Sequence, residues 1–174
     1  MKLLTLKFII IFIYLISSSS SYAIQTPNLK NLVIHKEPKK LEKINFKNIN
    51  NENINLNKFK DSLIIINFWA TWCLPCKREM PSLDQLAEKL PDIMIYPINL
   101  EKVNKTKAKN FYNELNIKNL KIFFDSELNL IKEFKLRGVP TTILINKKGE
   151  EFARILGEVD FENKKFVKWL LNYD

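Results

Sequence analysis

Short apolar runs alternate with polar, Asn-rich and Lys-rich stretches along this chain of 174 residues. The run 63–69, Leu-Ile-Ile-Ile-Asn-Phe-Trp, has the β-branched and aromatic content of a buried strand. Further apolar runs predict a second strand at 93–100 and a pair of strands at 141–146 and 151–156, joined by a hairpin turn. Two shorter strands, at 44–46 and 54–56, flank an Asn-rich turn.

Helical spacing separates these strands. Residues 77–90 predict a helix soon after the first buried strand, and positions 108, 111, 112 and 115 form one apolar face of a helix over 106–115. A weak helix or extended turn is expected at 128–134, and a last helix follows Asp160 as its N-cap. Strands that alternate with helices and end in a hairpin and a helix predict an α/β fold whose mixed sheet is covered on both faces.

The first 23 residues have the pattern of a targeting segment. Lys2 and Lys7 supply positive charge, residues 8–16 are apolar, and Ser21 and Ala23 are the small residues that a signal peptidase reads. The apolar run is short for a membrane span, which needs about 20 residues. We therefore expect residues 1–23 to be a cleaved export signal, with an uncleaved membrane anchor as the alternative.

Residues 24–41 are polar, contain Pro27 and Pro38, and show no sustained period. They predict a flexible leader that is dispensable for chemistry. The remaining residues, 42–174, are enough for one domain with its own core.

The net charge of +9 comes mainly from lysines scattered among Asn and Ile, with only Arg78, Arg137 and Arg154 as arginines. A basic balance can indicate an acidic partner. Here the lysines form no recognisable phosphate-reading motif, so we interpret them as solvated surface and expect no nucleic-acid partner.

The two cysteines of the chain lie in Trp72-Cys73-Leu74-Pro75-Cys76, between the buried strand 63–69 and the helix 77–90. A helix N-terminus directs backbone N–H groups and a partial positive charge at the first sulfur, which favours the thiolate that attacks disulfides. The motif therefore predicts redox chemistry. We expect Cys73 to be exposed and Cys76 to be shielded one turn into the helix.

Two structural roles for the cysteines fit the sequence less well. A disulfide across four residues closes a loop too short to stabilise the fold much. A zinc site needs about four ligands, and the one histidine, His35, is far upstream of the cysteines. We expect no metal site.

The segment Phe68-Trp69-Ala70-Thr71-Trp72-Cys73-Leu74-Pro75-Cys76, with Gly138-Val139-Pro140-Thr141-Thr142 downstream, resembles the thioredoxin superfamily and within it the TlpA/ResA branch of thiol-disulfide oxidoreductases. The resemblance covers residues 44 to the C-terminus. It implies a thioredoxin-like fold with an N-terminal β-hairpin extension, 44–56, and a central insertion, 106–124.

The resemblance also implies the roles of single residues. Cys73 would be the attacking thiol and Cys76 the resolving thiol. Pro140 would be a cis-proline that faces the disulfide and leaves the backbone of Val139 free to bind an extended substrate. Trp72, Leu74 and Pro75 would complete the substrate-binding rim, whereas Trp69 is expected in the core.

Asn67 and Glu79 distinguish the chain within this superfamily. Asn67 occupies the place of a buried Asp in cytosolic thioredoxins, and an amide cannot act as the base. Glu79 lies three residues after Cys76, on the same helix face, where the TlpA/ResA branch has a carboxylate. Glu79 is therefore the candidate base, and the alternative is a solvated acid that complements the helix dipole.

The resemblance implies an extracytoplasmic, monomeric protein-disulfide reductase that needs no cofactor. Its partners would be a disulfide-containing protein client, as in cytochrome or oxidase biogenesis, and a DsbD- or CcdA-like membrane carrier that restores the dithiol. Two alternatives stay open. A thiol peroxidase of the same fold would have Thr where Ala70 stands, and a copper-delivery module would need a late histidine.

Overall fold

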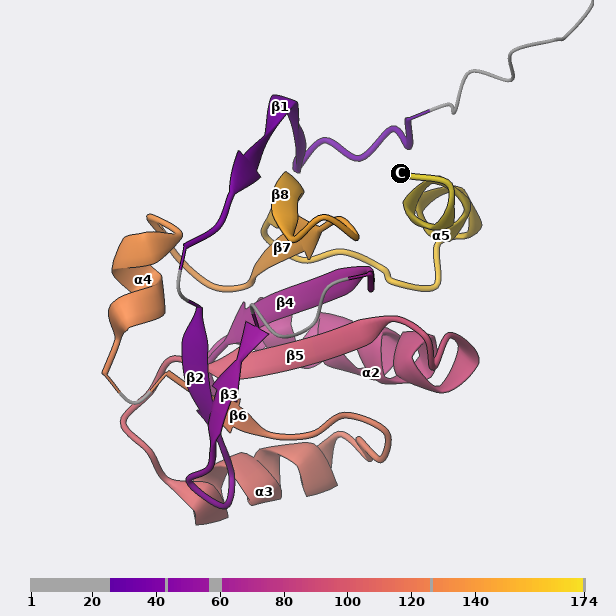
Figure 1. Cartoon of the computed structure of the whole chain (residues 1–174). Helices are drawn as coiled ribbons and strands as arrows, with labels where there is room; N and C mark the ends of the chain where they lie inside the picture. Colours follow the sequence, from indigo (N-terminus) through magenta and orange to yellow (C-terminus); the bar gives the residue numbers. More distant parts are fainter. Residues whose placement is uncertain (1–25, 43, 57–60, 126, 174) are drawn as a thin grey trace, which may run out of the picture.

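The computed structural model describes residues 26–42, 44–56, 61–125 and 127–173. One eight-stranded mixed sheet runs through them in the order β1-β8-β7-β4-β5-β6-β2-β3 (Figure 1). The strands are β1 (Leu32–Lys40), β2 (Asn45–Asn48), β3 (Asn53–Asn55), β4 (Ile64–Trp69), β5 (Met94–Asn99), β6 (Phe123–Phe124), β7 (Thr141–Ile145) and β8 (Glu150–Leu156). The helices are α2 (Leu74–Lys89), α3 (Lys105–Glu114), α4 (Asn129–Glu133) and α5 (Lys164–Leu171).

The centre of the sheet is β4, which pairs in parallel with β5 and antiparallel with β7. All six residues of β4 are buried, as expected for a strand that is covered on both faces. Because side chains alternate along a strand, Ile65, Asn67 and Trp69 point to one face and Ile64, Ile66 and Phe68 to the other. The predicted buried strand is therefore confirmed, and Asn67 shares a face with Trp69.

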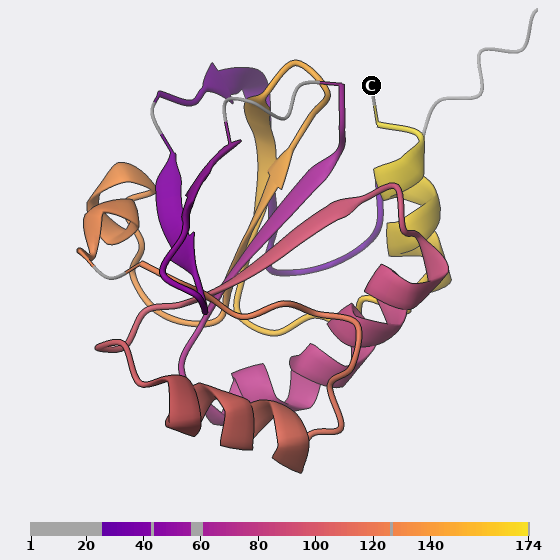
Figure 2. The ribbon, with the colours of Figure 1, turned by 60° about the horizontal axis from the view of Figure 1, so that its bottom comes forward.

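Helices cover the two faces unequally. The face with Ile65 and Trp69 packs against apolar residues of α2, α3 and α5, and the opposite face packs against Leu130 and Phe134 of the α4 segment and against the β2–β3 hairpin. Figure 2 shows α4 on the other side of the sheet from α2 and α5. The expected α/β architecture with a mixed sheet and an N-terminal hairpin is present, and residues 106–124, expected as a central insertion, contain most of α3 and all of β6.

The N-terminal strand β1 corrects one prediction. Residues 32–40, expected in a flexible leader, pair antiparallel with β8 at the edge of the sheet, and the register shifts between Ile34 and Lys39. Pro38 lies in that interval, where a missing N–H is tolerated. The strand shows no apolar period because nearly all its side chains are exposed and the backbone pairing holds it. The domain therefore begins before residue 42.

Asp160 is not the N-cap of the last helix. α5 begins later than predicted, and the Asn163 Oδ1 accepts hydrogen bonds from the N–H groups of Lys165 and Phe166. Phe161, which is fully buried, occupies the position that would have begun the helix. Phe161 is therefore buried in the core before α5 begins.

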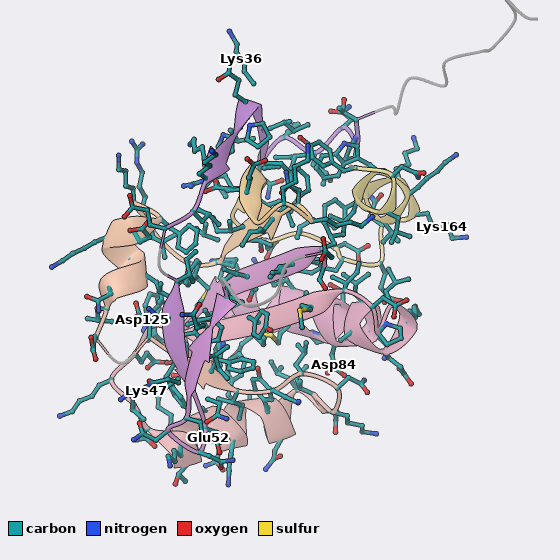
Figure 3. All side chains as sticks on the ribbon, viewed as in Figure 1. Lys36, Lys47, Glu52, Asp84, Asp125 and Lys164 are labelled. Atoms are coloured by element: carbon teal, nitrogen blue, oxygen red, sulfur yellow. A yellow bond between two sulfur atoms is a disulfide. The ribbon has the colours of Figure 1, made fainter. Side chains whose placement is uncertain are left out.

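Lysines on the outside of the fold, such as Lys36 and Lys164, are exposed and point away from the ribbon in Figure 3. Within the described residues, no helix has the length and apolar content to cross a membrane. The predicted targeting segment, 1–23, lies outside the described residues.

Candidate functional site

Cys73 and Cys76 form a disulfide with an S–S distance of 2.03 Å at the start of α2. Cys73 is the N-cap residue, and its Sγ accepts a hydrogen bond of 3.1 Å from the backbone N–H of Cys76. The same N–H group and the helix dipole would favour a thiolate on Cys73 after reduction. The structure therefore places Cys73 where the sequence predicts the nucleophile.

The sulfur atoms are less exposed than the sequence suggests. Cys73 is 3% exposed and Cys76 is fully buried in the disulfide form, so the expectation of an exposed Cys73 is wrong for this form. The neighbouring Trp72 and Leu74 are 71% and 62% exposed. These two side chains, together with the half-buried Pro75, are the sequence neighbours of the sulfurs that remain accessible to a client.

The Val139–Pro140 peptide bond is cis. The Thr141 hydroxyl donates a 2.8 Å hydrogen bond to the Gly138 carbonyl, and the Pro140 carbonyl accepts one from the N–H of Gly157. These bonds fix the loop before β7. Among the described residues, neither backbone group of Val139 has a hydrogen-bond partner, so both are available to an extended peptide.

An apolar pocket of about 230 Å³ joins this loop to the cysteine motif. Its single charged residue is Glu101, which follows β5, and two of its residues, Ile131 and Leu136, come from α4 and the turn after it. The lining is Ala70, Trp72, Leu100, Glu101, Ile131, Leu136, Gly138 and Val139. The sequence indicated Trp72 and Val139; it did not indicate the two residues from the α4 segment, although a weak helix or extended turn is expected at 128–134.

Glu101 fixes the turn that precedes Cys73. It accepts hydrogen bonds from both the backbone N–H and the hydroxyl of Thr71, and it forms an ion pair with Lys107 of α3. Partial burial would raise the pKa of Glu101, but the hydrogen bonds from Lys107, Thr71 and Asn99 outweigh it and lower the pKa to about 2. Glu101 is therefore an anion that ties the central insertion to the active-site turn.

Glu79 is buried, at 3% exposure, one turn after Cys76 on α2. Its Oε1 accepts a 2.7 Å hydrogen bond from Asn67 Nδ2, and its Oε2 accepts a 3.1 Å hydrogen bond from the N–H of Val159. The pKa of Glu79 is raised to about 7: burial raises it most, the hydrogen bonds from Asn67 and Val159 lower it, and the nearby charge of Glu158 adds a smaller increase. A solvated surface acid is thus excluded, and Glu79 can exchange a proton near neutral pH.

Asn67 brings the central strand into contact with Glu79. The Asn67 amide also donates to Thr142 Oγ1 at 3.1 Å, while its own Oδ1, fully buried, has no partner among the described residues. Sequence reasoning had excluded Asn67 as a base but had not identified this contact. The alternation of side chains along β4, which turns Asn67 toward α2, was the available signal.

Two further observations complete the site. Trp69 is fully buried and stacks on Phe111 of α3 at a centroid distance of 4.5 Å, which confirms its expected core position.

Within the described part of the chain, no group of three or more His, Cys, Asp or Glu residues could hold a metal ion. His35 is engaged elsewhere, in a 2.6 Å contact with Glu151 between β1 and β8.

Comparisons with known proteins agree with this geometry. A model of the AhpC/TSA family matches residues 38–150. Thiol-disulfide oxidoreductase ResA of Bacillus thuringiensis subsp. konkukian is 34% identical over 106 residues, which cover 60% of this chain and 61% of ResA. The match thus spans less than two thirds of that relative.

A second relative covers more of both chains. Sporulation thiol-disulfide oxidoreductase A of Bacillus subtilis is 30% identical over 123 residues, 68% of this chain and 73% of the relative. The crystal structure of StoA from Bacillus subtilis aligns with a TM-score of 0.62 and 28% identity over 76% of this chain and 98% of that structure. The expected resemblance to ResA-like proteins of the thioredoxin fold is confirmed.

Proposed function

We propose that this chain, which belongs to the AhpC/TSA family, is an exported thiol-disulfide oxidoreductase that reduces disulfides in protein clients. The observation that carries the proposal is the Cys73–Cys76 disulfide at the start of α2, beside an apolar pocket and a cis-proline loop. The names of the ResA and sporulation relatives, both thiol-disulfide oxidoreductases, support it.

The reaction transfers two electrons from the dithiol to the client. The Cys73 thiolate attacks one sulfur of the client disulfide, a mixed disulfide forms, and the other client sulfur leaves as a thiolate. Cys76 then attacks the Cys73 sulfur, and the second client sulfur leaves with the electron pair of the broken bond. Both client thiolates take protons from water, and Cys73 and Cys76 end as a disulfide. No cofactor takes part.

Glu79 would act as the base in the second step. The Cys76 thiol must lose its proton before it attacks, and Glu79 lies one turn further along the same helix. With a pKa of about 7, a large share of Glu79 is ionised near neutral pH and can accept that proton. General-base assistance of this kind contributes about 100-fold to a rate.

The client would bind across the apolar pocket. Trp72 and Leu74 offer exposed apolar surface on one side of the sulfurs, and the unpaired backbone groups of Val139 offer strand-like hydrogen bonds on the other. An extended segment that carries a disulfide and an apolar side chain fits this arrangement. A folded client with a buried disulfide does not.

The cellular setting follows from the N-terminal sequence. A segment with the pattern of an export signal would place the domain outside the cytoplasm, as a monomer that is free or tethered to the membrane at residues 1–23. Disulfides persist there, so a membrane carrier of the DsbD or CcdA kind would have to restore the dithiol. Cytochrome or oxidase biogenesis supplies clients of the required kind.

Reduction of insulin disulfides tests the proposal. We expect activity in the wild type, no activity in Cys73→Ser, and accumulation of mixed disulfides in Cys76→Ser, since nothing remains to resolve them. A reduction potential near about −270 mV fits a reductase, and one near about −120 mV would indicate an oxidant instead. Peroxide consumption without a disulfide client, or Cu(I) binding by the reduced protein, would favour the peroxidase or copper-delivery alternative.

A further inference from the structure

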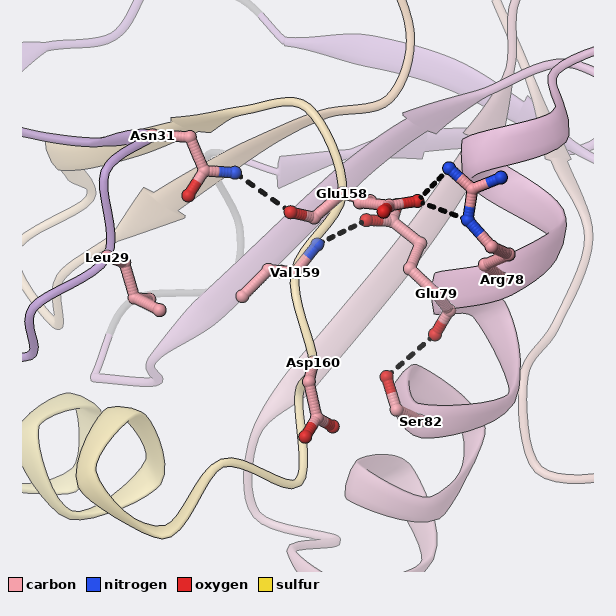
Figure 4. A pocket seen from close by; sticks show the side chains of 8 residues that line it. All are labelled: Leu29, Asn31, Arg78, Glu79, Ser82, Glu158, Val159 and Asp160. Atoms are coloured by element: carbon pink, nitrogen blue, oxygen red, sulfur yellow. Dashed lines mark hydrogen bonds and ion pairs between the residues drawn. The ribbon is translucent and has the colours of Figure 1, made fainter.

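A second pocket, of about 400 Å³, lies beside Glu79 and away from the apolar pocket (Figure 4). Its walls come from three places: α2, the segment that follows β8, and the residues before β1. The lining is Leu29, Asn31, Arg78, Glu79, Ser82, Glu158, Val159 and Asp160. Glu79 therefore borders a space large enough for several waters, lined by both polar and apolar residues, although its own side chain is almost fully buried.

Two consecutive residues of α2 hold two consecutive residues of the segment after β8. Arg78 contacts Glu158 Oε2 through Nη2 at 2.6 Å and through Nε at 2.8 Å, while Glu79 accepts the hydrogen bond from the Val159 N–H. Asn31 Nδ2 donates a third bond, of 2.8 Å, to the Glu158 carbonyl. The position of Glu158 relative to Glu79 is thus fixed from two sides.

The charges around Glu79 oppose one another. Glu158 places a like charge beside the Glu79 carboxylate, and Arg78 neutralises that charge. Asp160 also lines the pocket, and the groups that face Glu79 from the sheet, Asn67 of β4 and Thr142 behind it, carry no charge. Arg78 and Glu158 are about half exposed, so their ion pair adds little to stability, and its importance lies in where it is placed.

We propose that Arg78 and Glu158 are a positioning pair that adjusts the pH at which Glu79 exchanges its proton with water in this pocket. The inference rests on the proposed role of Glu79 as the base for Cys76. The proton that Glu79 takes from the Cys76 thiol leaves to pocket water beside Glu158, so the acid is ready for the next cycle without opening the apolar pocket that holds the client.

Substitution of the two residues should shift the titration of Glu79 in opposite directions. Glu158→Gln removes the like charge and lowers the pH at which Glu79 titrates. Arg78→Gln leaves the Glu158 charge unneutralised and raises that pH. Because both side chains are partly exposed, each shift amounts to a few tenths of a pH unit and shrinks in high salt.

The matched control is the Lys89–Glu162 ion pair, which also joins α2 to the segment after β8 but does not line the pocket. The experiment follows the Glu79 carboxyl carbon by NMR in the oxidised full-length protein labelled with 13C at glutamate side-chain carboxyls, with Glu79→Gln assigning the signal. We expect opposite shifts in Glu158→Gln and Arg78→Gln and none in Glu162→Gln. Unchanged midpoints, or shifts in the same direction for both variants, would overturn the proposal.

The oxidised protein does not turn over, so this titration is independent of activity. The pH profile of insulin reduction is then measured for the same variants. Profiles that move with the Glu79 midpoints support both the positioning pair and the base role. Midpoints that move while the profiles stay fixed would refute Glu79 as the base and leave the electrostatic coupling of Arg78 and Glu158 intact.

Discussion

Asn67 Nδ2 lies 2.7 Å from Glu79 Oε1, and this hydrogen bond connects the central strand to the buried acid of α2. A donor to the ionised carboxylate stabilises that form and counteracts the cost of burying it. The pKa of about 7 is therefore a balance between burial, which is the largest effect, hydrogen bonding by Asn67 and Val159, which lowers it, and the smaller effect of the like charge on Glu158, which raises it.

Asn67→Ala should raise the pKa of Glu79 above its wild-type value, because burial remains while the side-chain donor is lost. The Glu79 carboxyl titration measures the change, and the alkaline shift should appear in the pH profile of client reduction as well. Thr142→Val is the matched control, since it removes the other partner of the Asn67 amide without touching Glu79. An equal shift in both variants would contradict the assignment of the effect to the hydrogen bond that Asn67 donates to Glu79.

Glu79→Gln should lower the apparent pKa values of the thiols in the reduced protein. A carboxylate near the sulfurs disfavours a second negative charge, so wild-type thiols and acid titrate as a coupled set, and the amide removes that coupling. Release of reduced client should slow by about 100-fold near neutral pH. Alkylation and client reduction, each measured against pH, test this expectation; superimposable wild-type and variant profiles would remove Glu79 from the mechanism.

The same substitution should change how stability depends on pH. The folded-state pKa of Glu79, about 7, is above the ordinary value of 4.5, so the folded protein binds more protons than the unfolded chain between these two values. The contribution of Glu79 to stability is thus most favourable below pH 4.5 and falls as pH rises to about 7. Urea unfolding should show Glu79→Gln gaining at most about 3 kcal/mol over wild type across that window. A constant difference would contradict a raised pKa.

Sequence reasoning identified the elements whose side chains are buried. The apolar run 63–69 contains β4, whose six residues are all buried. The two cysteines lie at the start of the helix that follows this strand, as the sequence predicts. For Glu79, two signals conflicted: the residue shares the helix face of Cys76, Leu83 and Leu86, which indicates burial, and it carries a charge, which indicates solvent. Only the position of Asn67 and Val159 in the fold resolves that conflict.

The missed strand β1 has a different cause. An edge strand is held by backbone hydrogen bonds to β8, and backbone pairing leaves no periodic trace in a sequence whose side chains are exposed. The contact between His35 and Glu151 across the two strands likewise depends on a register that the sequence alone does not specify.

A chain that begins at Leu41 should therefore be less stable than the full domain. It lacks β1, exposes the edge of β8, and removes Leu29 and Asn31 from the pocket beside Glu79. We expect the free energy of unfolding to fall by about 2–4 kcal/mol, given a net contribution of about 1 kcal/mol for each hydrogen bond. A chain that begins at Pro27 is the control. If the urea midpoint of the shorter chain were unchanged, β1 would not contribute to stability, and residues 24–41 would be dispensable as the sequence alone predicts.

Glu101→Gln tests whether the central insertion supports the active-site turn. The amide can still accept one hydrogen bond from Thr71, but it loses the charge that Lys107 neutralises and cannot satisfy both Thr71 donors as a carboxylate does. We expect a loss of about 1–3 kcal/mol in the free energy of unfolding near neutral pH and slower client reduction, because the turn before Cys73 loosens.

Glu114→Gln, which breaks the exposed Lys77–Glu114 pair between α2 and α3, is the control and should change neither quantity measurably. The stabilisation by Glu101 is present above its unfolded pKa of about 4.5 and is lost as pH falls toward about 2, so the stability difference between wild type and Glu101→Gln should narrow in acid. A difference that stays the same from neutral pH to about pH 2 would show that the Glu101 charge does not hold the turn.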